Sequence, residues 1–397
     1  MRKPKTIMAT ISFKCPNCDG ELKFNPSGQN YICEYCGSTF TQEELDAMKR
    51  AETKEQTVEV EEKEPTINLD GVAVGPKGAS DGTFIDTDHN GIDDRFESYT
   101  NFYQGKDKDT AQVFICPSCG AEVVTDSTTA ATFCYYCHNP VVLGGRLQGD
   151  FLPHRIVPFK IDRKEAEKRF FEFIRKKHYV PKGFFHPKNV EKFTGIYFPY
   201  WQYDVDLKGA MQADAKKIRT WRTGNTEYTE TKSYHVFREG EISLYEKMEN
   251  ALRKANVDLV TGVLPYNLSQ TEEFNMGYLS GFFAEKRDIE TRDIADQVHT
   301  EMRGYADKLL RETIDFDVVK VKNSDVRLKK ENWNYLMLPV WTLTYKGKDG
   351  KLYYFSMNGQ TGKVYGKLPV DKLKLFLHSA LTALAVFGIV ILGGLMT

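Results

Sequence analysis

Eight cysteines are the residues of this chain whose type and spacing carry the clearest chemistry. They form two sets of four, each built from two Cys-x-x-Cys pairs, and the same number of residues separates the pairs in both sets. The first set is Cys15, Cys18, Cys33 and Cys36, and the second is Cys116, Cys119, Cys134 and Cys137. Four thiolates presented in pairs suit a tetrahedral metal site, so the spacing predicts two Zn²⁺ ions.

Each predicted site uses four protein ligands and leaves no coordination position open for water, which indicates structural and not catalytic zinc. Disulfides and a redox-active Cys-x-x-Cys pair are the alternatives. The N-terminal residues lack the apolar core of a signal peptide, so we expect a reducing compartment, and the paired spacing disfavours a redox motif. We interpret His138 as a surface neighbour of Cys137 and not as a fifth ligand.

The cysteine sets predict two zinc ribbons, over residues 11–40 and 113–143. In the first, residues 21–24 and 30–32 alternate like short strands around the turn at 25–28. Residues 11–50 carry four Lys and Arg against six Asp and Glu, and the second ribbon is also acidic. Since nucleic acid attracts the opposite charge, we expect no nucleic-acid partner and predict protein contacts for both ribbons.

An acidic stretch between the two sets is similar to the Asp-rich calcium loops of thrombospondin type-3 and dockerin-like repeats. Its candidate ligands are Asp86, Asp88, Asn90, Ile92 through its backbone carbonyl, Asp94 and Glu97. Oxygen ligands at alternate positions converge on a hard cation, and Gly91 permits the sharp turn. The pattern predicts one Ca²⁺ ion, and an acidic turn without an ion is the alternative.

At 397 residues and a net charge of −1, the chain should hold two or three folded units. Residues 41–85 form an acidic linker, and residues 86–97 hold the calcium-type loop. Residues 150–368 are the predicted α+β body.

Within the body we expect helices at 163–177, 244–254 and 289–314, with strands at 157–160, 196–205, 316–321, 333–345, 352–357 and 363–365. The motifs Phe198-Pro-Tyr-Trp201 and Leu338-Pro-Val-Trp341 suggest two related helix-and-sheet halves. The apolar stripe Ile294, Val298, Met302, Tyr305 and Leu309 predicts the core face of the long helix.

The stretch 375–396 has no charged residue and follows several lysines. It predicts one C-terminal transmembrane helix, and a buried core helix is the alternative. By the positive-inside tendency we expect a single-pass cell-membrane protein with its body in the cytoplasm.

The chain resembles the bacterial membrane-anchored zinc-ribbon proteins of the TFIIB type. The resemblance lies in Cys116-Pro-Ser-Cys119-Gly120, Gly195-Ile-Tyr-Phe-Pro-Tyr-Trp201, Gly281-Phe-Phe-Ala-Glu-Lys286, Leu338-Pro-Val-Trp341 and Met357-Asn-Gly-Gln-Thr-Gly-Lys-Val364. It implies no established enzymatic activity, and it implies association with phage-shock-type envelope-stress proteins and SPFH-like scaffold proteins. Residues 65–110, which hold the calcium-type loop, depart from the family pattern.

We therefore expect an α+β protein made of two zinc ribbons, a mixed helix and antiparallel-sheet body and one transmembrane helix. The expected function is a non-enzymatic membrane-anchored scaffold that presents cytoplasmic surfaces to partner proteins. A membrane-tethered nucleic-acid-binding regulator is one alternative. An enzyme in residues 150–368 is another, although no metal or triad spacing marks a catalytic site there and no phosphate-binding glycine loop is present.

Overall fold

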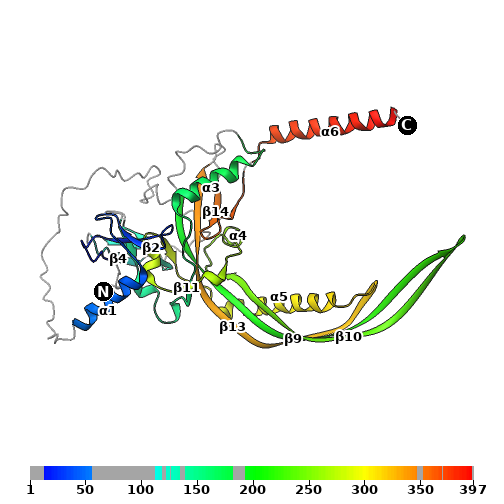
Figure 1. Cartoon of the computed structure of the whole chain (residues 1–397), viewed down its shortest axis with the longest axis horizontal. Coiled ribbons are helices and arrows are strands. Elements are labelled where there is room, and N and C mark those ends of the chain that lie inside the picture. Colours follow the sequence, from blue (N-terminus) through cyan, green and yellow to red (C-terminus); the bar gives the residue numbers. More distant parts are fainter. Residues whose placement is uncertain are drawn as a thin grey trace, which may run out of the picture.

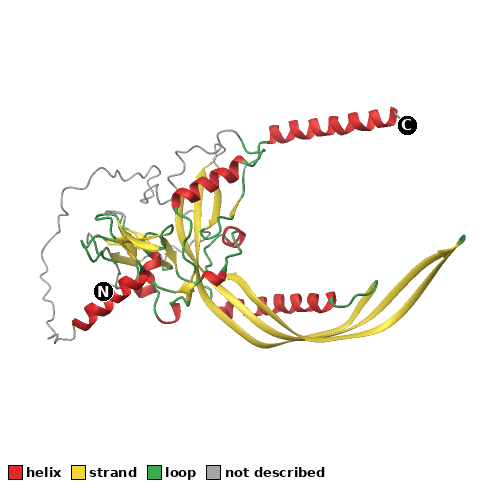
Figure 2. Cartoon of the chain, in the orientation of Figure 1, coloured by secondary structure: helices red, strands yellow, loops and turns green. Residues whose placement is uncertain are grey.

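The structure, a computed structural model, describes residues 13–55, 112–118, 122–125, 127–134, 139–181, 193–346, 352–368 and 370–395. These residues form mostly β-sheet, with a compact body, a long projecting arm and few helices (Figures 1 and 2). One ten-stranded sheet organises the body, and each ribbon adds a small sheet of its own.

The ribbon elements come first in the chain. They are β1 (Leu22–Asn25), β2 (Asn30–Cys33), β3 (Thr39–Phe40), α1 (Gln42–Glu55), β4 (Gln112–Ile115), β5 (Glu122–Thr125), β6 (Thr129–Phe133) and β7 (Pro140–Val142). Short 3-10 helices η1 (Gly144–Arg146) and η2 (Gly149–Phe151) then lead into the body.

The body is built from β8 (Arg155–Ile156), α3 (Arg163–Arg175), β9 (Phe193–Thr223), β10 (Thr226–Asn250), α4 (Val257–Gly262), η4 (Leu268–Gln270), β11 (Glu272–Glu273), η5 (Met276–Leu279), β12 (Phe283–Glu285), α5 (Thr291–Glu312), β13 (Val318–Lys346), β14 (Leu352–Asn358) and β15 (Val364–Gly366). The helix α6 (Lys372–Leu395) follows it.

Strands β9 and β13 form the centre of the large sheet. They pair antiparallel along nearly their whole length, and this register sets Phe198 opposite Leu338. The two similar motifs of the sequence therefore lie on neighbouring strands in the core. Their aromatic and aliphatic side chains are buried on both faces of the sheet, for example Tyr197 and Phe198 at 0% exposure. Such two-sided burial explains why these strands read as continuous apolar runs.

Three strands leave the body and form what we call the arm (Figure 1). The arm consists of β9 after Tyr203, β10 before Leu244 and β13 before Trp333. Helix α5 lies along one face of the arm and buries Val298, Met302, Ala306 and Leu310. The predicted apolar stripe is confirmed at Val298 and Met302 and wrong at Tyr305 and Leu309, which are 48% and 43% exposed. The opposite face of the arm carries ion pairs such as Lys208 with Glu239 and Lys322 with Asp214, together with the exposed side chain of Phe237.

The prediction of the fold class is wrong in its balance of helix and sheet, because the described chain is mostly sheet. Helices α3 and α5 match the predicted ranges 163–177 and 289–314. The helix predicted at 244–254 is absent, since these residues continue β10 up to Asn250. A bulge near Glu246, which has a φ of 61°, breaks the strand alternation there, and that break imitates a helical pattern.

The prediction of a transmembrane helix at 375–396 is also wrong. No helix within the described residues is long and apolar enough to cross a membrane. The single-pass cell-membrane location with a cytoplasmic body, which depended on this span, is corrected with it.

Asp162 links the first ribbon to the helix α3. Its carboxylate caps α3 by accepting from the Glu165 N–H at 2.8 Å, and it accepts from the Ser27 hydroxyl at 2.5 Å. These hydrogen bonds, led by the one from Glu165, lower the pKa of Asp162. A lowered pKa means that folding favours the charged carboxylate.

We expect Asp162→Ala to lower the free energy of unfolding by about 1–2 kcal/mol at neutral pH, the usual value of a helix cap. The loss of unfolding free energy should be greatest above a pH of about 3.9, the pKa of this aspartate in the unfolded chain. It should shrink as the pH falls through the lower pKa that Asp162 has in the folded chain. Urea unfolding across this pH range measures it. Lys168→Ala, on the exposed face of α3, is the control; an equal loss in that variant would contradict the assignment.

Candidate metal centre

The first cysteine set converges in the structure. Cys15 and Cys18 precede β1, Cys33 ends β2, and Cys36 lies in the turn before β3. All four sulfur atoms lie within 4.8 Å of one another. The Sγ atoms of Cys15 and Cys36 are 3.6 Å apart, and those of Cys18 and Cys33 are 3.5 Å apart.

These distances fit a tetrahedral metal site. Sulfur atoms held about 2.3 Å from a common Zn²⁺ ion at tetrahedral angles are about 3.8 Å apart. A disulfide would require about 2.05 Å, and the four cysteines form none. The ligand set therefore fits a divalent ion that prefers thiolates.

The two Cys-x-x-Cys turns have the same backbone hydrogen bonds. Cys15 N–H donates to Gly20 O and Cys33 N–H donates to Ser38 O, each spanning five residues. The carbonyls of Cys15 and Cys33 each accept from the residue four positions later. That residue has a left-handed conformation in both turns, with φ of 57° at Asp19 and 75° at Gly37. The repeated turn aims each pair of sulfurs inward.

Gly20 lies directly against the sulfur cluster. A Cβ atom at this position would lie 3.0 Å from Cys33 Sγ and 3.2 Å from Cys18 Sγ, closer than ordinary van der Waals contact. Because glycine has no side chain, the backbone at Gly20 can pass close to the sulfur atoms of Cys18 and Cys33.

The crowded sulfurs differ in acidity. Hydrogen bonds from the Ser38 side chain and backbone lower the pKa of Cys36 to about 6. The Gly20 N–H lowers the pKa of Cys18, but its sulfur neighbours Cys36 and Cys33 outweigh this and raise it to about 12. Close like charges disfavour a fully ionised cluster. A divalent cation would supply the charge that lets all four cysteines act as thiolates.

The first ribbon packs against the body. Phe24 N–H donates to Ser280 O at 3.0 Å, the Ser280 hydroxyl donates to Leu22 O at 2.5 Å, and Gln29 donates to Phe159 O at 2.7 Å. Its apolar side chains, including Phe24 and Tyr31, belong to the same buried cluster as the body. A metal ion held by the four cysteines would therefore stabilise a ribbon that is packed against the body.

A hydrogen bond also joins the two ribbons, between the Ser118 hydroxyl and the Glu21 carboxylate. Glu21 is 7% exposed, and burial raises its pKa. Ser118 belongs to the first Cys-x-x-Cys turn of the second ribbon, so the two cysteine-bearing units meet at this point.

The second cysteine set is described in part. Cys116 and Cys134 are buried together in a small apolar cluster. Cys134 N–H donates to Asn139 O at 2.9 Å, the same five-residue bond that marks both turns of the first ribbon. Strand β6 of this ribbon pairs with β12, so the ribbon extends the large sheet. Cys119, Cys137 and His138 lie outside the described residues.

The calcium-type loop also lies outside the described residues. This applies to all of its candidate ligands, Asp86, Asp88, Asn90, Ile92, Asp94 and Glu97. The predicted Ca²⁺ site stays a prediction.

Sequence reasoning missed a buried ion pair within the body that also accepts a hydrogen bond from the second ribbon. Glu285 is fully buried, accepts from the Thr128 hydroxyl at 2.7 Å and pairs with Lys254 at 3.0 Å. Burial, followed by nearby Asp288, raises the pKa of Glu285 well above its usual value. The motif at 281–286 contains Glu285, but the partner residues are distant in sequence and no periodic pattern marks them.

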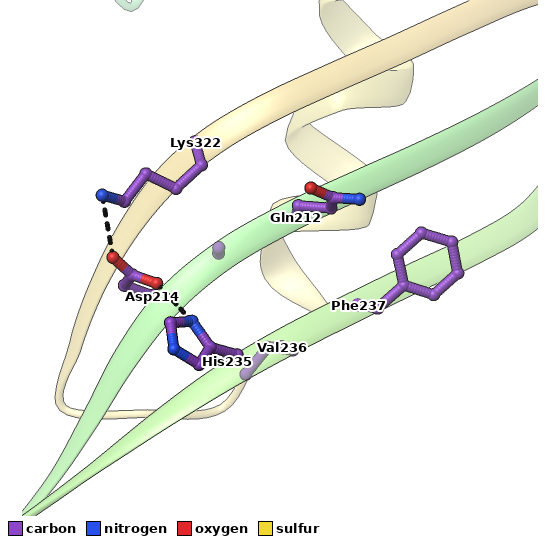
Figure 3. Close-up of a pocket in the computed structure, with 7 residues that line it drawn as sticks. Gln212, Asp214, His235, Val236, Phe237 and Lys322 are labelled. Carbon is purple, nitrogen blue, oxygen red and sulfur yellow. Dashed lines mark ion pairs between the residues drawn. The ribbon is translucent and has the colours of Figure 1, made fainter.

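A second polar cluster lies on the arm (Figure 3). Asp214 pairs with His235 at 2.7 Å and with Lys322 at 2.9 Å, beside a hollow of about 300 Å³. The residues that line the hollow include no serine or cysteine nucleophile, and His235 is 96% exposed. The cluster is one of several ion pairs across the three strands, including Lys208–Glu239 and Lys329–Glu241. It fits a solvated face better than a catalytic site.

Comparisons with known proteins give one informative match. The chain is similar to YdjG, an uncharacterised protein of Bacillus subtilis (strain 168), with 28% identity over 235 residues. The match covers 59% of this chain and 69% of that protein. No family model and no solved structure matches the chain. The resemblance to YdjG is therefore shown, and membership of the TFIIB-type zinc-ribbon family stays a prediction.

Proposed function

We propose that this chain is a non-enzymatic scaffold in which metal-held ribbons, docked on a sheet body, present binding surfaces to partner proteins. The observation that carries the proposal is the closed four-cysteine cluster on a docked ribbon. Four protein ligands leave no position for a substrate or an activated water, so such an ion stabilises structure. A ribbon joined to the body by hydrogen bonds holds its outer surface at a fixed place.

The proposed metal is zinc, at both cysteine sets. Thiolate-only tetrahedral sites favour Zn²⁺ over hard cations, and iron in the same geometry is the main competitor. For the second site, the support is the shared backbone bond at Cys134 and the identical spacing of its cysteines.

Elemental analysis of the purified chain should give about two zinc ions per chain, the number that two four-cysteine sites bind. Cys134→Ser should lower the content to about one and leave the first site filled. Ser118→Ala, in the same ribbon, is the control with unchanged content. A content of one in the unsubstituted chain, or iron in place of zinc, would contradict this assignment.

The outer surface of the first ribbon has the character of a protein-binding surface. Tyr35, between Cys33 and Cys36, is 82% exposed, the largest exposure among the large apolar residues that the structure describes. Exposed aromatic side chains held on rigid turns often anchor protein interfaces. The acidic ribbon charge disfavours a nucleic-acid partner there. Binding of phage-shock-type or SPFH-like proteins, which the family resemblance implies, stays a prediction.

Tyr35→Ala tests the scaffold proposal without touching a metal ligand. A photo-crosslinker placed at Asn17, in the other Cys-x-x-Cys turn of the ribbon, should capture defined proteins in cells. Tyr35→Ala should reduce that capture by about tenfold, as the loss of a residue that anchors an interface does. Zinc content should not change. Tyr179→Ala, an exposed aromatic far from the ribbon in sequence, is the matched control. Absence of any captured protein, or equal capture in both variants, would contradict a ribbon-based scaffold.

A further inference from the structure

The outer edge of strand β10 on the arm has no partner strand in the described part of the chain. From Thr226 to Leu244, β10 pairs with β9 without a shift in register, and the other side of β10 pairs with no described strand. Long regular edges are templates for strand addition, and natural proteins usually interrupt them. This edge has no bulge until Leu244.

The opposite edge of the arm is protected in the expected way. Strand β13 shifts register near Lys322 and again near Lys329 as it pairs with β9. Bulges and lysines are the devices that keep sheet edges from pairing with other chains. Beyond Lys216, where the pairing with β13 ends, β9 offers only the seven residues 217–223 on that side, so β10 is the long regular edge open to a partner.

We propose that β10 is a self-association edge, at which the arm of a second copy of this chain pairs antiparallel about a two-fold axis at Tyr234. A partner strand for this edge must itself be long and unbroken, whereas most strands have about five or six residues. The chain supplies such a strand in its own β10, and two-fold pairing of one surface with itself is the commonest way to form a dimer.

The two-fold symmetry restricts the register. Two residues that lie opposite each other in a sheet point to the same face, and side chains alternate between the two faces along a strand. The two opposed residues of the paired β10 strands must therefore be an even number of positions apart in the sequence. The two-fold axis then passes through a residue and not between two residues. An axis at Ser233 sets Glu227 opposite Glu239, and an axis at His235 sets Lys232 opposite Arg238. An axis at Tyr234 sets Glu230 opposite Arg238, and symmetry makes this ion pair twice. Among these three axes, which lie at the middle of the regular edge 226–244 and so pair most of it, only the Tyr234 axis sets opposite charges against each other.

Two further pairs fit the Tyr234 register. Tyr228, 46% exposed, faces Gly240, where a side chain would meet nothing within 4 Å. Cross-strand packing of an aromatic ring over glycine fills such a space. The Tyr234 register also holds one like-charge pair, Glu227 with Glu241, in which Glu241 is paired with Lys329 at 2.6 Å. Glu239 is paired with Lys208 in the same way, so the opposite-charge pair of Glu230 with Arg238 is what distinguishes the Tyr234 register from the Ser233 one.

The proposal goes beyond the ribbon-based function, because the arm and the sulfur cluster are separate sites. Substitutions on the arm should leave the zinc content unchanged. A failure of the arm proposal would therefore leave the ribbon proposal standing, and the reverse also holds.

Crosslinking of single introduced cysteines tests the pairing and its register on the full chain. In Tyr234→Cys, the Cα atoms of the two new cysteines lie about 4.5–5.5 Å apart across the axis, so a short bis-maleimide should give a covalent dimer. Phe237→Cys alone should give none, because its two copies are about 20 Å apart at 3.4 Å per residue. A mixture of Phe237→Cys with Thr231→Cys should crosslink again. The unsubstituted chain measures background from the native cysteines.

Charge reversal tests the same register without new thiols. Glu230→Arg should raise the dimer dissociation constant by about tenfold or more, since symmetry sets two like-charge pairs against each other. The double variant Glu230→Arg with Arg238→Glu should restore association. Sedimentation of the full chain measures both. A chain that stays monomeric, a dimer indifferent to Glu230→Arg, or crosslinks at Tyr234→Cys only to another protein would overturn the proposal.

Discussion

The structure depends first on bringing four cysteine sulfurs within 4.8 Å of one another. Such crowding is unfavourable for bare thiolates, because close like charges repel one another. A bound cation turns this repulsion into attraction and fixes both turns of the ribbon. The buried side chains of the ribbon and of the body belong to one apolar cluster. Loss of the metal ion would therefore destabilise part of the body as well as the ribbon.

Contacts continue from the first ribbon to the second and into the large sheet. Glu21 and Ser118 join the ribbons, and strand β6 joins the second ribbon to β12. The buried pair of Glu285 with Lys254 lies at that junction. The Thr128 hydroxyl of the second ribbon donates to Glu285 at 2.7 Å, so an undocked ribbon would leave this buried carboxylate short of one hydrogen bond. The long arm extends from the other end of the same central strands.

The sequence predicted the features that have local causes. Cysteine spacing located the first ribbon, and Asp162 with the apolar period located α3. The long arm was not predicted. Polar and apolar residues alternate along β10 and β13, but this alternation indicates only that the residues form strands, and it does not show how long the strands are or which strands they pair with. The bulge near Glu246 disguised strand as helix. The uncharged C-terminal stretch predicted a membrane span, but no helix within the described residues is long and apolar enough to cross a membrane. The docking of Phe24 against Ser280 depends on residues far apart in sequence, which no local pattern reveals.

Hydrogen exchange of the full chain, with the metal bound and after its removal by a chelator, tests the central claim most directly. If the metal holds the ribbon against the body, its removal should abolish protection in β1 and also in η5 and β12, where Ser280 and its neighbours meet the ribbon. Protection in α5, on the arm, should stay unchanged. Loss of protection confined to the ribbon, with η5 and β12 unaffected, would contradict the account.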